Sequence, residues 1–114
     1  MSEAAAYRRI NKHRPFLELL QSAEKNQQQA LLKTATNEQI RILSEIVLNI
    51  LIGNIPLTQK TKNNFSRYKD KLRELSDQTL PSETLKKKWN KFSVEILETV
   101  IKIVFKFFRD ILLQ

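Results

Sequence analysis

Apolar side chains recur three or four residues apart along almost the whole 114-residue chain, and this spacing constrains the fold more than any other feature. Only one Gly and three Pro interrupt the pattern, and no segment alternates apolar with polar residues as a strand would. A period of three to four residues places apolar side chains on one face of a helix. The sequence therefore predicts an all-α fold, a compact bundle of four to five helices with a long amphipathic C-terminal helix.

Capping and helix-breaking residues mark the ends of these helices. Pro15 suits the first turn of a helix, where its missing N–H costs nothing. Thr36 and Gln39 have the spacing of a capping box, and Gly53 fits a left-handed C-terminal cap. Pro81 ends one helix before the next begins. The predicted helices cover residues 15–22, residues 24–35, a third segment from Thr36 to Gly53, residues 58–77 and residues 83–113.

The length is typical of one domain with one hydrophobic core. We expect residues 15–114 to form this domain and residues 1–14 to form a basic N-terminal arm. The chain contains no Cys, which excludes a disulfide framework and a thiolate metal site. No secretory pattern is visible at the start, because the first residues are polar and are followed by Arg8 and Arg9. We therefore expect an intracellular protein that is not secreted, in the nucleus or the virion if its origin is viral.

Positive charge is concentrated in the middle of the sequence. The whole chain carries a net charge of +8, and residues 58–91 hold ten Lys and Arg against four Asp and Glu. Such a segment attracts polyanions, usually nucleic acid or an anionic membrane surface. The alternative is that the charge serves solubility alone.

Two clusters of cations are candidate nucleic-acid contacts. They consist of Arg8, Arg9, Lys12 and Arg14 in the N-terminal arm, and of Lys86, Lys87, Lys88 and Lys91 at the start of the last helix. Lys and Arg bind phosphates without reading the base sequence. This interpretation requires that both clusters face water together and are not neutralised by carboxylates of their own chain. Trp89, within the second cluster, can stack on a base or pack with Phe92 against the bundle, and we expect packing.

The C-terminal helix has an unusually wide apolar face, spanning an arc of roughly 200° at about 100° per residue. Three interpretations remain open: the centre of the core, a contact with a second copy of the chain, or a contact with a membrane surface. A transmembrane span is excluded by the charges along the segment. For the oligomer or membrane face the candidate residues are Ile96, Val100, Ile103, Val104, Phe107, Phe108 and Ile111.

The residues expected of an active site are missing from the sequence. His13 is the single His and lies between Lys12 and Arg14, where positive charge disfavours its protonation. There is no Cys, no glycine-rich phosphate loop and no grouping of metal-ligand residue types. We therefore expect a protein that is not an enzyme and that uses no cofactor, metal or small-molecule substrate.

Several short blocks, taken in order, resemble a small basic core-like protein of Polinton/Maverick elements and adintoviruses. The blocks are Lys-His-Arg-Pro-Phe-Leu at residues 12–17, Leu-Leu-Lys-Thr-Ala-Thr at 31–36, Leu-Ser-Glu-Ile at 43–46, Gly-Asn-Ile-Pro-Leu at 53–57, and Tyr68-Lys69 with Leu72-Arg73. The last pair stands where that family usually has His-Lys and Leu-Arg. The resemblance covers residues 12–88 and ends there, because the family continues with a Gly-Gly-Phe-Leu stretch that this chain lacks. It implies a viral or transposon origin and association with DNA, similar to the adenovirus core peptide that condenses packaged DNA.

These observations lead to one main hypothesis and one alternative. The main hypothesis is a non-enzymatic helical protein that binds nucleic acid, most simply DNA, without sequence preference, as an oligomeric virion-core or DNA-condensing component. The alternative is a protein–protein interaction or oligomerisation module that uses the apolar face of the C-terminal helix, with membrane contact as a further outcome.

Overall fold

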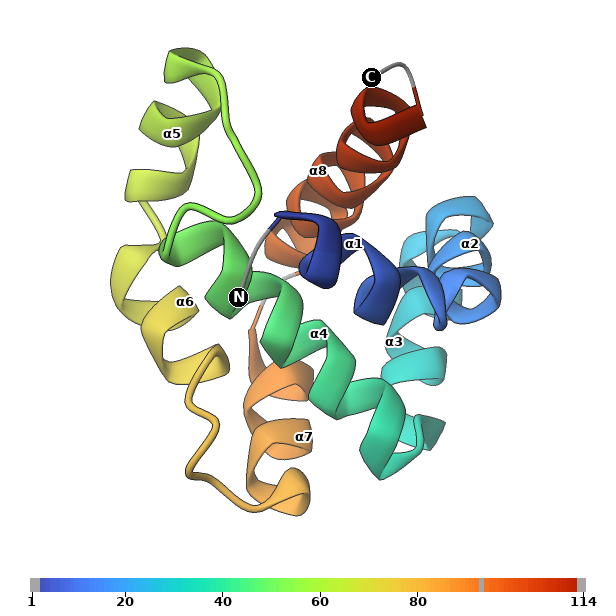
Figure 1. The fold of residues 1–114 in the computed structure, drawn as a ribbon. Coiled ribbons are helices and arrows are strands. Elements are labelled where there is room, and N and C mark those ends of the chain that lie inside the picture. The colour runs from blue at the N-terminus through green and yellow to red at the C-terminus, as the bar shows by residue number, and fades with distance from the viewer. Residues whose placement is uncertain (1–2, 93, 113–114) are drawn as a thin grey trace.

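The computed structural model describes residues 3–92 and 94–112, which form helices and short connectors without any strand (Figure 1). The described chain measures 36 × 28 × 27 Å along its principal axes. This confirms the predicted all-α class, but the described residues form eight helices instead of four to five. The helices are α1 (Glu3–Asn11), α2 (Arg14–Ser22), α3 (Lys25–Thr34), α4 (Asn37–Leu51), α5 (Gln59–Ser66), α6 (Lys69–Leu75), α7 (Ser82–Lys91) and α8 (Val94–Leu112).

Helix α4 crosses the middle of the molecule and contacts α1, α6, α7 and α8 (Figure 1). Its start is the predicted capping box: the Gln39 N–H donates to the Thr36 hydroxyl (3.1 Å), and the Gln39 side-chain oxygen accepts from the Thr36 N–H (2.9 Å). Its end is also as predicted, since Gly53 has a φ of +86°. Two N–H groups just after this turn donate to the Asn49 carbonyl, so the helix ends with its backbone acceptor satisfied.

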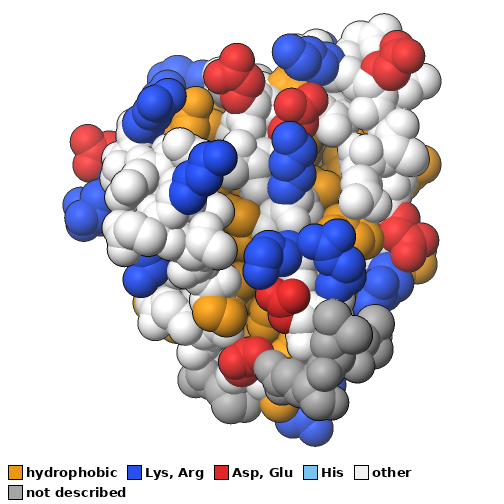
Figure 2. All heavy atoms as spheres, turned by 90° about the horizontal axis from the view of Figure 1, so that it is seen from above, with side chains coloured by type: hydrophobic (Ala, Val, Ile, Leu, Met, Phe, Trp, Pro, Cys, Tyr) orange, Lys and Arg blue, Asp and Glu red, His pale blue; other side chains and the backbone are white. Residues whose placement is uncertain are grey.

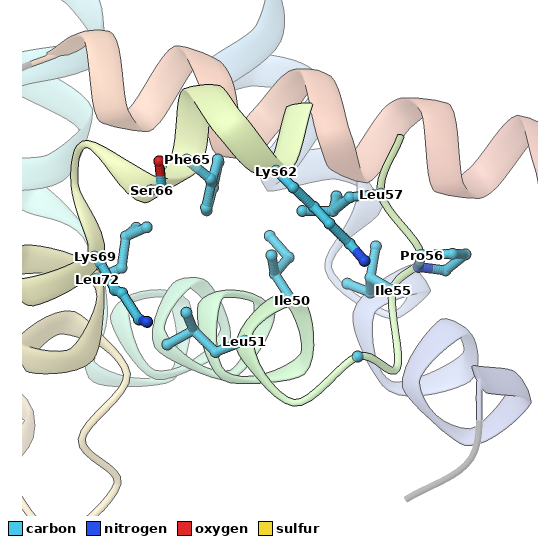
Figure 3. A pocket seen from close by; sticks show the side chains of 11 residues that line it. Ile50, Leu51, Ile55, Pro56, Leu57, Lys62, Phe65, Ser66, Lys69 and Leu72 are labelled. Carbon is cyan, nitrogen blue, oxygen red and sulfur yellow. The ribbon is translucent and has the colours of Figure 1, made fainter. Parts of the chain in front are cut away.

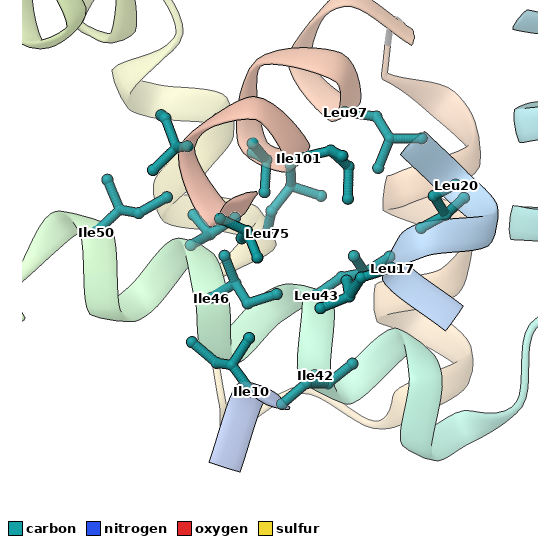
Figure 4. Close-up of a cluster of buried hydrophobic side chains, with 14 of the residues drawn as sticks. Ile10, Leu17, Leu20, Ile42, Leu43, Ile46, Ile50, Leu75, Leu97 and Ile101 are labelled. Carbon is teal, nitrogen blue, oxygen red and sulfur yellow. The ribbon is translucent and has the colours of Figure 1, made fainter. Parts of the chain in front are cut away.

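The hydrophobic core lies between α4 and α8 and is closed by the remaining helices (Figure 4). Leu43 and Ile46 of α4 are fully buried, as are Leu17 of α2 and Leu75 of α6. Burial on this scale removes several large apolar side chains from water, each worth about 1.5–3 kcal/mol. One continuous core thus includes every part of the chain from α1 to α8.

The predicted long helix over residues 83–113 is two helices, α7 and α8, that differ in direction (Figure 1). The chain becomes extended at Phe92, with φ −83° and ψ 158°. A straight helix of that length would be about 46 Å long at 1.5 Å per residue. This exceeds the largest dimension of the molecule, 36 Å. The break allows both halves to bury their apolar faces, α7 on α3 and α4, and α8 on α1 to α4.

The predicted helix over residues 58–77 is also two helices, α5 and α6, which separate at Arg67 and Tyr68. No Gly or Pro lies at this point, so the sequence carries no conventional signal for the break. The Ser66 hydroxyl donates to the Asn63 carbonyl (2.6 Å), which satisfies an acceptor at the end of α5. Helix α6 packs on α4 and α7, whereas α5 buries Phe65 as its one buried residue. The break therefore separates a well-packed helix from a peripheral one.

The first residues are part of the domain and not a separate basic arm. Helix α1 buries Ala6 and Ile10, and it contacts α4 and α8. The Tyr7 ring meets Phe107 and Phe108 edge-on, with ring centroids 6.3 and 5.6 Å apart. The prediction that residues 1–14 lie outside the domain is wrong for residues 3–14, because Ala6, Tyr7 and Ile10 supply an apolar face that α4 and α8 cover.

The apolar face of α8 is buried inside the chain itself. Six of its seven candidate residues are at most 7% exposed, and the seventh is partly buried: they are Ile96, Val100, Ile103, Val104, Phe107 and Phe108, with Ile111 the partly buried one. These side chains are core residues and do not present an open face to a second chain or a membrane. The reason is that α1 and α2 both pack on α8 and cover part of its wide apolar face. Among the described residues, no helix combines the length and apolar character needed to span a membrane.

Candidate nucleic-acid interface

The N-terminal cluster is partly neutralised by its own chain. Arg9 forms a bidentate pair with Glu45 of α4, in which its Nη2 donates to Oε1 at 2.6 Å. The hydrogen bond and charge of Glu45 raise the pKa of Arg9 above its usual value. Arg14 places its guanidinium 4.1 Å from the centre of the Phe108 ring and donates from Nε to the Asn11 side chain (2.7 Å). Both arginines therefore hold α1 and α2 in place.

Arg8 and Lys12 are exposed, as Arg9 is, but unlike Arg9 they have no ion-pair partner in the described chain. No carboxylate of the described chain lies within 4.0 Å of either side chain. They are the part of the N-terminal cluster that remains accessible to a phosphate.

The second cluster, on α7, is divided in the same way. Lys86 donates to the Ala35 carbonyl (3.1 Å), and Lys88 lies 3.4 Å from the Glu74 carboxylate of α6. Lys87 and Lys91 are exposed and are one helical turn apart, so they project from the same outer face of α7. Here too, half of the predicted contacts are engaged within the chain.

The two clusters do not form one surface. Helix α1 packs on α4 and α8, whereas α7 packs on α3, α4 and α6. Arg9 of α1 donates to Glu45 of α4, and Trp89 of α7 donates to Ser44, the residue before Glu45. Adjacent residues of a helix point about 100° apart, so α1 and α7 approach α4 from different sides. The requirement that both clusters face a ligand together is therefore not met.

Trp89 is a core residue. It is 2% exposed, and its indole N–H donates to the Ser44 hydroxyl at 3.1 Å. Phe92, its expected packing partner, also packs against the core. The expectation that Trp89 packs in the bundle is confirmed, and its ring is not available to stack on a base.

A third group of cations, on α5, in the turn after it and at the start of α6, belongs to the basic segment 58–91 but is not among the contacts predicted from the sequence. Lys60, Lys62, Arg67 and Lys69 lie in a stretch between Glu45 and Asp70 that contains no acidic residue. All four are exposed, and none has a carboxylate within 4.0 Å in the described structure. We name these four residues the α5 cluster.

The α5 cluster was missed because residues 58–77 were treated as one helix. On one continuous helix Asp70, Glu74 and Asp77 interleave with the cations and divide the positive surface. Because α5 ends before the turn at residues 67–68, Asp70 and Glu74 lie on α6, and Asp77 lies in the connector after it. The absence of any acid between Glu45 and Asp70 was a usable signal, independent of the helix boundaries.

Most of the positive charge of the described chain has no carboxylate partner. All twenty Lys and Arg are described, and four of them, Arg9, Arg73, Lys88 and Lys106, pair with Asp or Glu. The others are spread over the surface. Figure 2 shows one face on which Lys and Arg side chains are scattered among polar and apolar groups, some of them side by side, with acidic side chains between them. Such a distribution suits contacts to several phosphates and does not suit one deep anionic site.

No group of three or more metal-ligand side chains occurs among the described residues. His13 lies with its Nε2 3.6 Å from the exposed Glu38 carboxylate, at the edge of a small hollow that Arg9 and Lys12 also line. One imidazole beside one carboxylate does not provide a nucleophile with an oriented base.

Comparisons with protein-family models, with curated proteins and with solved structures found no match to this chain.

Proposed function

We propose that this protein binds nucleic acid through its phosphates, without sequence preference and without catalysis, and that the α5 cluster is the principal contact. The observation that supports this most is the stretch from Glu45 to Asp70, which carries four exposed, unpaired cations and no acid between its ends. Lys and Arg that neutralise phosphates release counterions, and this release supplies the affinity. The cluster shifts the predicted site from the N-terminal arm and α7 to α5.

The nature of the polyanion follows from the resemblance to adintoviral core-like proteins, which favours packaged DNA. A DNA-condensing or virion-core role needs many weak phosphate contacts and no base readout. The spread of cations over the surface is compatible with that need. The structure gives less support to the alternative of oligomerisation through α8, because that face is buried.

The proposal is tested by measuring the affinity for two duplex DNAs of unrelated sequence at about 50 and 200 mM salt. A site that neutralises roughly three phosphates on duplex DNA gives a logarithmic salt slope of about −2.7, so a fourfold rise in salt weakens binding by about 40-fold. We expect this slope, and equal affinity for both sequences.

Two triple variants with the same change in net charge locate the contact. One carries Lys60→Gln, Lys62→Gln and Lys69→Gln. The matched control carries Lys12→Gln, Lys87→Gln and Lys91→Gln, which are also exposed and unpaired. The first variant is expected to reduce the salt slope to about −0.9, because Arg67 remains, and the control to leave most of the slope. Absence of binding at 50 mM salt, or an equal loss in both variants, would refute the proposal.

A further inference from the structure

An open apolar groove lies between the C-terminal end of α4 and the helices α5 and α6 (Figure 3). Its volume is about 460 Å³, within the range of pockets that bind drug-sized groups. Its floor consists of side chains from four segments, α4, the connector that follows it, α5 and α6: Ile50, Ile55, Phe65 and Leu72 are its buried members. Leu51, Pro56 and Leu57 complete the apolar wall.

Two lysines stand at the rim of this groove. Figure 3 shows Lys62 extending from α5 across the cavity toward Ile55, and Lys69 extending from the start of α6 toward Leu51. No Asp or Glu lines the groove, and neither ammonium group has a carboxylate partner in the described chain. The site therefore combines an apolar floor with an uncompensated positive rim.

The apolar surface continues beyond the cavity. Three large hydrophobic side chains of the described chain are strongly exposed, and two of them, Leu51 (37%) and Ile52 (59%), are adjacent at this end of α4. A small molecule enclosed in the cavity would leave Ile52 in water, because Ile52 is not a lining residue. Exposed apolar side chains beside an apolar groove are typical of interaction sites, protein–protein sites among them.

The charge of the chain argues against a second copy of itself as the occupant. Two copies would each bring a net charge of +8 to the contact. The chain also has no run of acidic residues to place against Lys62 and Lys69. Nucleic acid is a poor occupant as well, since phosphates gain nothing from the apolar floor.

We infer that this groove docks a short segment of another protein, one that presents one or two bulky apolar side chains flanked by Asp or Glu. The apolar side chains fill the cavity and cover Leu51 and Ile52. The acidic residues pair with Lys62 and Lys69, which also steer the segment toward the groove. This inference does not depend on the proposed nucleic-acid function, although Lys62 and Lys69 belong to both surfaces, and a docked segment would compete with DNA.

The test selects peptides from a phage-displayed library of random 12-residue sequences against the full chain without nucleic acid. Selected sequences are expected to carry acidic residues around an apolar pair. A synthetic peptide of the strongest sequence is then titrated by fluorescence anisotropy. Leu51→Gln is expected to weaken it about tenfold, equivalent to 1.4 kcal/mol. The matched control, Leu19→Gln, changes a similarly exposed Leu on α2 and is expected to change affinity less than twofold.

Charge and DNA measurements complete the test. Lys62→Glu should weaken the peptide at least as much as Leu51→Gln, while Lys25→Glu, at an exposed site on α3, should not. Leu51→Gln should weaken peptide binding but leave DNA affinity within twofold. The peptide titration therefore tests the groove, and the DNA titration separately tests the phosphate site. The inference is overturned if selected peptides lack acidic residues or if Leu19→Gln acts like Leu51→Gln. It is also overturned if dodecanoate or phosphatidylglycerol vesicles bind the groove and the selected peptides do not.

Discussion

The hydrogen bond between Trp89 and Ser44 offers the sharpest test of how α7 is held. Trp89 is the single Trp of the chain, and its indole N–H donates to the Ser44 hydroxyl on α4, which is fully buried. Replacing Trp89 with Phe removes the donor and leaves that hydroxyl without it. We expect a loss of stability and no direct effect on a nucleic-acid contact.

The magnitude follows from two contributions. A buried polar group left without its partner costs about 1–3 kcal/mol. The smaller ring also leaves unfilled space, which adds about 1 kcal/mol. The expected total for Trp89→Phe is therefore about 2–4 kcal/mol, out of roughly 5–15 kcal/mol for the whole domain. For a chain of this length it corresponds to a Tm lower by about 8–16 °C.

Denaturant unfolding followed by circular dichroism measures this loss for Trp89→Phe, Ser44→Ala and the double variant. Ser44→Ala leaves the indole N–H without its acceptor in the same way, so the two losses in free energy of unfolding should not be additive. The loss in the double variant should be smaller than the sum of the two single losses by about 1–2 kcal/mol. In the wild-type protein, DNA should leave the Trp89 fluorescence unquenched. Additive losses, a loss below 0.5 kcal/mol for Trp89→Phe, or strong quenching by DNA would refute the reasoning.

Three further outcomes are expected. Gly53→Ala should cost about 1–2 kcal/mol in denaturant unfolding, since φ is +86° and an added Cβ meets nothing within 4 Å, and Gly53→Asn should cost less. Arg9→Gln should lower the free energy of unfolding by about 1 kcal/mol, because it leaves Glu45, whose side chain is 16% exposed, without its partner. Glu45→Gln should lower it by less. Equal losses in the two variants would contradict the pairing. Hydrogen bonds from Thr79 lower the pKa of Asp77, so its carboxylate stabilises the folded chain at neutral pH, and this stabilisation is lost as the pH falls below about 4. The free energy of unfolding of Asp77→Asn should therefore fall less on acid titration than that of the wild type. Identical titration curves for the two proteins would contradict this role of Asp77.

Short-range chemistry made much of the fold predictable. The capping box at Thr36, the left-handed Gly53 and Pro15 in the first turn of α2 each act within a few residues, and each lies where the sequence predicts. The all-α class follows from apolar spacing alone, which is also local. The core role of Trp89 was predicted on the same basis.

The candidate site was predicted less well, because exposure and pairing depend on distant parts of the chain. Arg9 meets Glu45, 36 residues away, and Lys86 meets the Ala35 carbonyl, 51 residues away. Neither contact has a sequence pattern. Half of the eight predicted cations are consequently held within the chain, and the exposure of the α5 cluster follows from the helix break at residues 67–68, which the sequence does not mark.

The sequence by itself determined that this chain is helical, basic and free of Cys, and where several of its helices begin and end, because propensity, capping and charge act locally. Tertiary structure decided how the long apolar segments divide and which of their faces meet. A straight 31-residue helix would be about 46 Å long, more than the 36 Å that the described chain spans, and the described residues of 83–113 form two helices instead. The same packing brings Tyr7 and Arg14 onto Phe108, which covers the apolar face of α8, while Leu51 and Ile52 at the end of α4 stay exposed.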